Sequence, residues 1–149
     1  MQISTRGRQL IESFEGLKLT SYQDQRGIWT IGYGSTADVW PSMTITQEQA
    51  DDRMGVDLHN TEQVIYKTVK VDINQNQCDA LGSLIYNIGG GAFTKSTLLR
   101  LLNQSDFVGA ANQFLVWDKL DGIINEGLLN RRNRERELFM AVPNVTGTT

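Results

Sequence analysis

Apolar residues recur at helical spacing along most of the chain. The first predicted helix covers residues 4–15, because Leu10 and Phe14 fall on one face and Gly16 follows as a stop signal. This places Glu15 in the last turn of the helix, at its carboxyl end.

The pattern then becomes that of strands. Residues 17–22 and 28–33 are rich in β-branched and aromatic side chains, and residues 25–27 between them have the composition of a turn. This predicts a β-hairpin. Gly32 and Gly34 interrupt its second strand, which indicates a bend or the close approach of another backbone segment.

Helical spacing returns after the hairpin. A capping box at residues 46–49 begins a helix, although Gly55 and Asn60 weaken its continuity. The next helix begins at Asn74 and is expected to end at the three glycines 89–91. The remaining predicted helices are two short ones capped by Ser96 and Ser105 and a last one over residues 126–140.

These elements predict one α+β domain over residues 1–149, mostly helical, in which a small β-hairpin lobe and a larger helical lobe flank a cleft. The predicted bounds are about 17–46 for the small lobe, about 47–66 for a linking helix, and about 67–142 plus helix 4–15 for the helical lobe. Residues 145–149 are expected to form a frayed tail.

Composition removes several function classes. The chain has 14 basic and 17 acidic residues, which disfavours a dedicated nucleic-acid binder. One cysteine, Cys78, and one histidine, His59, exclude an intramolecular disulfide and a closed zinc site of the Cys/His type. The sequence contains no nucleotide or haem motif, no signal-like segment, and no apolar stretch near the ~18 residues of a membrane span.

The informative chemistry lies between residues 15 and 30. Glu15 ends a helix, Asp24 enters the hairpin turn, and Thr30 lies on the strand that leaves it. Two carboxylates across a groove are the minimal equipment for hydrolysis of a glycosidic bond. The helix end and apolar neighbours disfavour the ionised form of Glu15, which suits a proton donor, whereas Asp24 is expected to stay ionised. From the residues alone, a solvated helix end and an ordinary turn former remain the alternative.

Several separated motifs extend beyond these three residues. They are Glu15-Gly16-Leu17, Tyr22-x-Asp24, Trp29 to Gly34, Asn87-Ile88-Gly89, Phe93-x-x-Ser96-Thr97-Leu98-Leu99 and Gly127-Leu128-x-x-Arg131-Arg132-x-x-Glu135. In this order they resemble the phage-type lysozyme (endolysin) family, glycoside hydrolase family 24, over about residues 6–140. The spacing Glu-x8-Asp-x5-Thr matches the catalytic triad of that family.

The resemblance implies a lysozyme-like fold and a muramidase that hydrolyses the β-1,4 bond from N-acetylmuramic acid to N-acetylglucosamine in peptidoglycan. Glu15 would be the proton donor, and Asp24 and Thr30 would hold the attacking water. That role implies inversion at the anomeric carbon and a carboxyl separation of roughly 6.5–9.5 Å, rather than the ~5 Å of a covalent mechanism. No metal or cofactor is implied.

Position-matching also implies sugar-binding candidates. They are Gly34, Tyr86, Asn87 and Ser96. Ordinary structural roles compete for three of them: a bend for the glycine, a half-buried core position for the tyrosine and a helix cap for the serine. Ser35 stands where many family members have histidine, which puts in doubt any ion pair that such a histidine makes.

Four arginines lie in the last predicted helix. Arg131 is expected to reach Glu15 and orient it, and its charge would oppose protonation of that carboxyl group. Arg132, Arg134 and Arg136 are expected on a solvated face with intrahelical pairs. Attraction of this helix to an anionic lipid or cell-wall polymer is the alternative.

The resemblance also implies a cellular context. A monomer is expected to accumulate in the cytoplasm of a bacterial host, without a membrane anchor or nucleic-acid partner, and to reach peptidoglycan once a holin permeabilises the membrane. Two other functions remain open: a lytic transglycosylase, which can work with the acid alone, and a non-catalytic wall-binding module.

Overall fold

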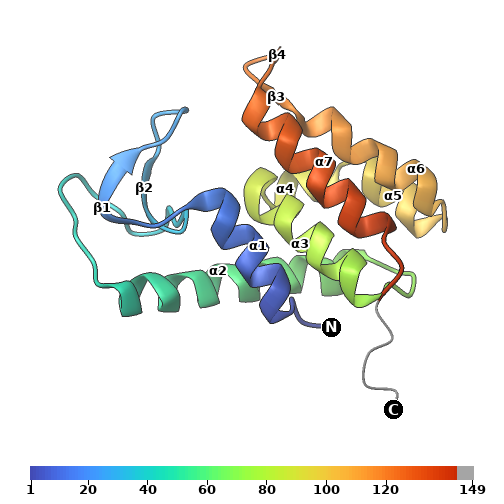
Figure 1. Cartoon of the computed structure of the whole chain (residues 1–149), viewed down its shortest axis with the longest axis horizontal. Coiled ribbons are helices and arrows are strands. Elements are labelled where there is room, and N and C mark those ends of the chain that lie inside the picture. Colours follow the sequence, from blue (N-terminus) through green and yellow to red (C-terminus); the bar gives the residue numbers. More distant parts are fainter. Residues whose placement is uncertain (144–149) are drawn as a thin grey trace.

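The protein's structure is a computed structural model that describes residues 1–143, and the predicted tail at 145–149 lies outside the described residues (Figure 1). Its elements are α1 (Thr5–Glu15), β1 (Lys18–Gln23), β2 (Trp29–Gly32), α2 (Gln47–Thr68), α3 (Gln75–Ile88), α4 (Gly90–Thr94), α5 (Thr97–Asn103), α6 (Phe107–Gln113), a 3-10 turn (Phe114–Trp117), β3 (Lys119–Leu120), β4 (Ile123–Ile124) and α7 (Glu126–Met140). The predicted α+β, mostly helical class is confirmed.

Local signals define the ends of the long helices. The side chain of Ser4 accepts a hydrogen bond from the backbone of Gly7 and so caps α1. Both α2 and α3 begin with complete capping boxes, at Thr46 and Asn74 respectively. Despite Gly55, α2 is one continuous helix.

One predicted helix cap is wrong. Asp106, not Ser105, caps α6, because its carboxylate accepts a hydrogen bond from the backbone of Gly109 at 2.8 Å while Ser105 adopts a φ of +61°. The predicted end of the helix from Asn74 is confirmed, because α3 ends at Ile88 with Gly89 as its cap, but the short helix α4 that begins at Gly90 was not predicted.

The small lobe contains the antiparallel hairpin β1–β2. Tyr22 lies opposite Thr30 and Gln23 opposite Trp29, with an irregularity in the register before Tyr22. Because facing residues project to the same side of a hairpin, the side chains of Tyr22 and Thr30 share one face. This pairing puts Tyr22, rather than Asp24, directly across from Thr30.

A second, shorter hairpin was not predicted. Its strands β3 and β4 have two residues each, and Asp121 and Gly122 between them have φ of +51° and +78°. Strands of this length carry no measurable alternation, so an Asp-Gly turn was the only local signal. In Figure 1 this hairpin lies at the end of the helical lobe, beside the start of α7.

Two groups of buried side chains form the core. The larger surrounds α3, which packs against α1, α2 and α7 and contributes Leu81 and Leu84, both fully buried. The smaller group lies between α1, α2 and the turn after β2, around Ile11 and Met54. The element α2 contributes to both groups, and Figure 1 shows it extending beneath both the hairpin and the helices. The residue bounds given above for the two lobes and the linking helix remain a prediction.

Candidate active site

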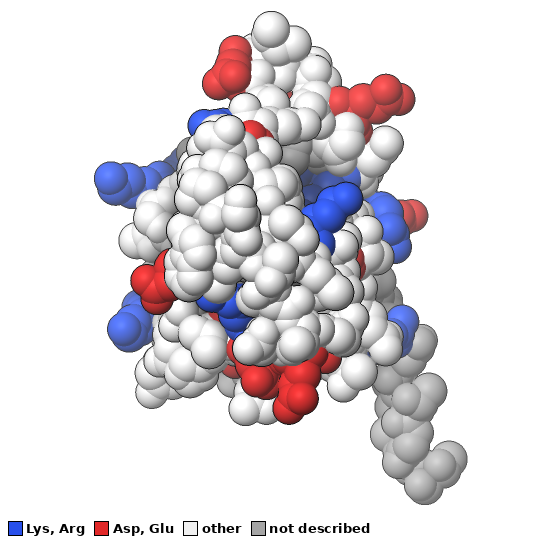
Figure 2. All heavy atoms as spheres, turned by 90° about the vertical axis from the view of Figure 1, so that its left-hand side faces the viewer, with Lys and Arg blue, Asp and Glu red and all other residues white. Residues whose placement is uncertain are grey.

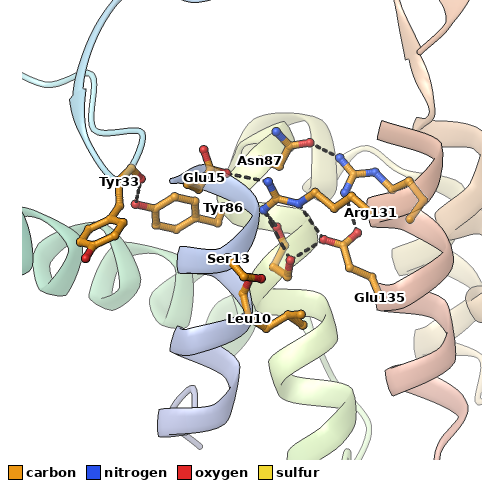
Figure 3. Close-up of polar contacts among 10 residues, drawn as sticks. Leu10, Ser13, Glu15, Tyr33, Tyr86, Asn87, Arg131 and Glu135 are labelled. Atoms are coloured by element: carbon orange, nitrogen blue, oxygen red, sulfur yellow. Dashed lines mark hydrogen bonds and ion pairs between the residues drawn. The ribbon is translucent and has the colours of Figure 1, made fainter. Parts of the chain in front are cut away.

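Glu15 lies at the carboxyl end of α1 and points into the space between the hairpin and α7 (Figure 3). Its side chain is 18% exposed, and its Oε2 accepts a hydrogen bond from Nη1 of Arg131 at 2.6 Å. The same guanidinium stacks over the ring of Phe14, 4.8 Å from the centroid. The predicted contact between Arg131 and Glu15 is therefore present, whereas its orienting role stays a prediction.

A network of buried charges continues from Arg131 into the helical lobe. Nε of Arg131 donates to Oε2 of Glu135 at 3.1 Å, and Nη1 of Arg132 donates to Oε1 of the same carboxylate at 2.5 Å. The hydroxyl of Ser83 donates to Glu135 as well. At the end of the network away from Glu15, Arg132 donates to the side-chain oxygen of Asn87.

The expectation that Arg132 lies on a solvated face of α7 is wrong. Its side chain is fully buried, as is that of Glu135, so this arginine is part of the core. Burial lowers the pKa of Arg132, while the nearby Glu135 carboxylate opposes that shift. Arg136 bonds to the side chain of Asn112 on α6. The helix therefore does not present four arginines as one basic surface.

Asp24 is held by the turn that it begins. Its Oδ1 accepts hydrogen bonds from the backbone amides of Arg26 at 2.8 Å and Ile28 at 2.9 Å. Its own backbone amide donates to the carbonyl of Ile28, and the amide of Gly27 donates to the carbonyl of Asp24. Among residues 1–143, Oδ2 of Asp24 has no hydrogen-bond partner, so it remains able to accept from a bound molecule.

Thr30 is nearly buried at 3% exposure and is tied to the same turn. Its hydroxyl donates its one hydrogen to the carbonyl of Ile28 at 2.8 Å. Since a hydroxyl has one donor and two acceptor positions, Oγ1 of Thr30 can only accept from any further partner. Asp24 and Thr30 thus both bind the backbone of Ile28 and both present acceptor oxygens.

Tyr22 is a site residue that the sequence-based candidates omitted. Burial raises the pKa of its hydroxyl, and the Glu15 and Asp24 carboxylates add to this shift, so both acids lie close enough to act on one phenol. Its position opposite Thr30 places these two side chains on one face of the hairpin. The motif Tyr22-x-Asp24 held the available signal, because it places the tyrosine two residues before Asp24, next to the turn.

Gly34 adjoins Glu15 directly. Its φ is +86°, and a Cβ at this position would lie 2.6 Å from Oε1 of Glu15. The missing side chain therefore leaves the space that the carboxylate occupies. Gly34 also lines a cavity of about 220 Å³ together with Thr36, residues of α2 and the end of α3.

Tyr86 and Ser96 use their hydroxyls within the protein. Tyr86 donates to the backbone carbonyl of Tyr33 at 2.6 Å, and its ring lines the same cavity. Burial, together with the charges of Asp57 and Glu15, raises the pKa of Tyr86 and keeps this donor protonated. Ser96 caps α5: its hydroxyl accepts from the amide of Leu99 and donates to a backbone carbonyl. The hydroxyl of Tyr86 therefore ties the helical lobe to the small one, whereas that of Ser96 serves its own helix.

Comparison with known proteins assigns the chain to a family. The family model "Phage lysozyme" matches residues 12–135. The chain belongs to the phage lysozyme family. It is 46% identical to the endolysin of Salmonella phage P22 over 95% of this chain and 99% of that protein. It is 42% identical to the endolysin of Acyrthosiphon pisum secondary endosymbiont phage 1, with coverage of 93% and 98%.

A solved structure agrees with this assignment. The muramidase domain of SpmX from Asticaccaulis excentricus is 35% identical and matches with a TM-score of 0.87, covering 95% of this chain and 99% of that one. The predicted family, the lysozyme-like fold and the enzyme class, a peptidoglycan-hydrolysing glycoside hydrolase of the endolysin type, are confirmed. As a phage lysozyme, the protein acts on the bacterial cell wall.

Ser35 departs from the histidine that many phage lysozymes have at this position. Its side chain is buried and donates to Oδ2 of Asp57 on α2 at 2.6 Å. The backbones of Ser35 and Ile31 also exchange two hydrogen bonds, which close the turn that carries Gly34. A neutral hydroxyl thus bonds the α2 carboxylate, and no ion pair is needed there.

Charge on the small-lobe face is mixed. Figure 2 shows Lys and Arg side chains scattered around this face, with one group of acidic side chains at its lower end and others near its upper and left edges. No helix within residues 1–143 is long and apolar enough to cross a bilayer. In the same range, no three His, Cys, Asp or Glu side chains cluster as metal ligands; that the enzyme needs no metal or cofactor stays a prediction.

Proposed function

We propose that this phage lysozyme hydrolyses the β-1,4 bond from N-acetylmuramic acid to N-acetylglucosamine with inversion, and that Glu15 protonates the leaving oxygen. The partly buried position of Glu15 between Gly34 and Arg131 supports this role. Arg131 holds Oε2 of Glu15, and the missing side chain of Gly34 leaves room for Oε1, so the carboxyl group has a defined direction, which transfer of a proton to a glycosidic oxygen requires.

The observation that carries the hydrolytic assignment is the pair of acceptors at Asp24 and Thr30. Oδ2 of Asp24 is unoccupied within the described residues, and Oγ1 of Thr30 has already donated its hydrogen to Ile28. A water molecule between them donates one hydrogen to each, so a lone pair of its oxygen is left for the anomeric carbon. Asp24 then takes a proton as the water attacks, and the sugar carbon inverts.

The glycan strand extends along the cavity beside Gly34 and Tyr86. Asn87 follows Tyr86 on α3 without lining this cavity; Arg132 occupies its side-chain oxygen and leaves its amide hydrogens for a sugar acetamide carbonyl. The aromatic ring of Tyr86 offers a flat apolar surface to a sugar face. Both hydroxyl bonds of Ser96 are made to the backbone at the start of α5, so Ser96 acts on the site only by fixing the position of this helix.

The wider context is part of the same proposal. The enzyme works as a monomer, remains in the host cytoplasm until lysis, and depends on a holin to reach peptidoglycan. A test is lysis of cells that express the protein with and without a holin. Rapid lysis without any permeabilising protein would contradict holin dependence and leave the enzymatic assignment unaffected.

The direct test is digestion of purified peptidoglycan in water enriched in ¹⁸O, with products identified by mass. We expect reducing N-acetylmuramic ends that carry one ¹⁸O, and NMR of the first products should show the α-anomer before mutarotation. The β-anomer would contradict inversion and indicate a covalent intermediate on Asp24. Anhydro ends without label would identify a lytic transglycosylase, and wall binding without any product would identify a binding module.

A further inference from the structure

The buried side chains behind Glu15 form a chain of alternating charges. From the cleft inward it comprises Glu15, Arg131, Glu135 and Arg132, joined by contacts of 2.6, 3.1 and 2.5 Å. Figure 3 shows Glu15 at one end, Glu135 behind Arg131, and Asn87 beside the far guanidinium. The chain thus connects the proposed proton donor to the proposed sugar-binding amide.

Water is excluded from the inner part of this chain. The side chains of Glu135 and Arg132 are 0% exposed, and that of Arg131 is 6% exposed. Coulomb interactions between such groups are screened far less than at the surface. A change of charge at Glu135 is therefore transmitted to Glu15 through Arg131, although Glu135 lies outside the cleft.

Arg131 creates a conflict at Glu15. A proton donor must hold its proton at the working pH, whereas a guanidinium at 2.6 Å favours the ionised carboxylate. Other groups that act on this region include the phenols of Tyr22 on β1 and Tyr86 on α3, both of which interact electrostatically with Glu15. From α7 they include Arg132 and Arg134, and the guanidinium of Arg134 lies 5.1 Å from the ring centroid of Phe14. The carboxylate of Asp24, at the hairpin turn, also acts electrostatically on Tyr22.

We propose that Glu135 is a positioning residue for the proton donor, which holds Arg131 in place against Glu15 and offsets the charge of that guanidinium. This inference rests on the proposed function of Glu15. Behind Glu15 lie two guanidinium groups and one carboxylate, so one positive charge is uncompensated. Loss of the Glu135 charge leaves two uncompensated guanidinium groups behind Glu15.

The guanidinium of Arg132 gives this chain of charges a second role. Arg132 bonds Glu135 with Nη1, the carbonyl of Trp117 with Nε, and Asn87 with Nη2, so its position determines where the Asn87 amide points. Glu135 thereby aligns the acid and the amide through two arginines at once. Ser83 completes the arrangement, because its carbonyl accepts from Arg131 and its hydroxyl donates to Glu135.

The test is the pH profile of kcat/KM on peptidoglycan for Glu135→Gln. Its alkaline limb, where the donor loses its proton, should move about one pH unit lower than in the wild type. Glu137→Gln is the matched control, because it removes the same charge from an exposed position on the same helix. Its profile should coincide with that of the wild type. An unmoved limb in a folded Glu135→Gln enzyme would overturn the inference.

Arg132→Met supplies a test of opposite sign that also serves if Glu135→Gln does not fold. It removes one positive charge, and methionine fills a similar volume, so the alkaline limb should move to higher pH and KM should rise through Asn87. An alkaline limb that stays in place or moves to lower pH in Arg132→Met would refute charge compensation. Non-specific destabilisation of the fold gives no reason for the limb to shift in the direction set by the removed charge. A wild-type enzyme that releases no reducing ends would instead refute the proposed function itself.

Discussion

The two carboxylates of the site are held in opposite ways. Glu15 is fixed by residues remote in sequence: Arg131 bonds it from 116 positions away, and Gly34 on the other lobe leaves room for it. Asp24 is fixed by its own turn, through amides two and four residues further along. One side of the active site is therefore a product of tertiary packing and the other of a five-residue segment.

The difference corresponds to the chemistry that we propose for each side. An acid that must hold a proton requires restricted water and a balanced set of charges, which only the meeting of several elements provides. A group that activates water requires an accessible oxygen in a defined direction, which a single turn can provide. Five substitutions test this contrast, with Thr30→Ala taken beside Asp24→Asn and the others in order of decreasing expected effect.

Glu15→Gln should reduce turnover by about a thousandfold or more, because the amide cannot donate the required proton. The fold should remain, since glutamine still accepts from Arg131. Peptidoglycan turbidity and reducing-end assays measure the loss. Glu12→Gln is the control: Glu12 lies on the same helix and pairs only with Arg8, at 3.7 Å, within residues 1–143. Near-normal turnover in Glu15→Gln would exclude this residue as the donor.

Asp24→Asn should reduce kcat by about a hundredfold, because the neutral amide cannot take a proton from water. Asparagine keeps an oxygen for the two backbone amides, so the melting temperature should change little. Thr30→Ala should cause a smaller loss, since it removes one of two acceptors. If both variants instead mainly lower the melting temperature, the two residues serve the hairpin rather than the water.

Gly34→Ala should reduce kcat by about a hundredfold through displacement of the Glu15 carboxylate. Gly122→Ala is the matched control, because Gly122 also has a positive φ, of +78°, but nothing lies within 4 Å of its added Cβ. Both variants carry similar backbone strain, so the comparison isolates the clash. Equal kinetic effects in the two variants would show that Glu15 tolerates the extra methyl group.

Ser35→Ala should leave turnover within about twofold and lower the free energy of unfolding by about 2 kcal/mol, because it removes a donor to the Asp57 carboxylate. Since serine does not titrate near neutral pH, the loss should be the same at pH 5.5 and pH 7.5. Urea denaturation at both pH values measures this. A strongly pH-dependent difference would mean that another group controls this contact.

Local sequence signals were sufficient for most elements. The capping boxes at Thr46 and Asn74 and the turn after Asp24 each act within four residues, so their effects are visible in the sequence. Ser105 failed as a cap because Asp106 follows it directly, and competition between adjacent capping side chains depends on the backbone. The β3–β4 hairpin was too short to show alternation.

The buried charges could not be predicted. Arg131 with Glu135 and Arg132 with Glu135 have the i,i+4 and i,i+3 spacing of ordinary solvated pairs. Nothing in the spacing distinguishes an exposed helix face from one covered by another helix. The signal that existed was the place of both arginines and Glu135 within one family motif.

The sequence by itself determined most of the helices, the main hairpin, the family, and the candidate acid, base and hydroxyl, because each depends on short-range spacing or on motif order. Tertiary structure alone decided what surrounds Glu15: the arginine that bonds it, the glycine that leaves it room, and the buried carboxylate behind that arginine. These contacts join α1, the turn after β2, and α7, and their electrostatic effect depends on the exclusion of water where those elements meet.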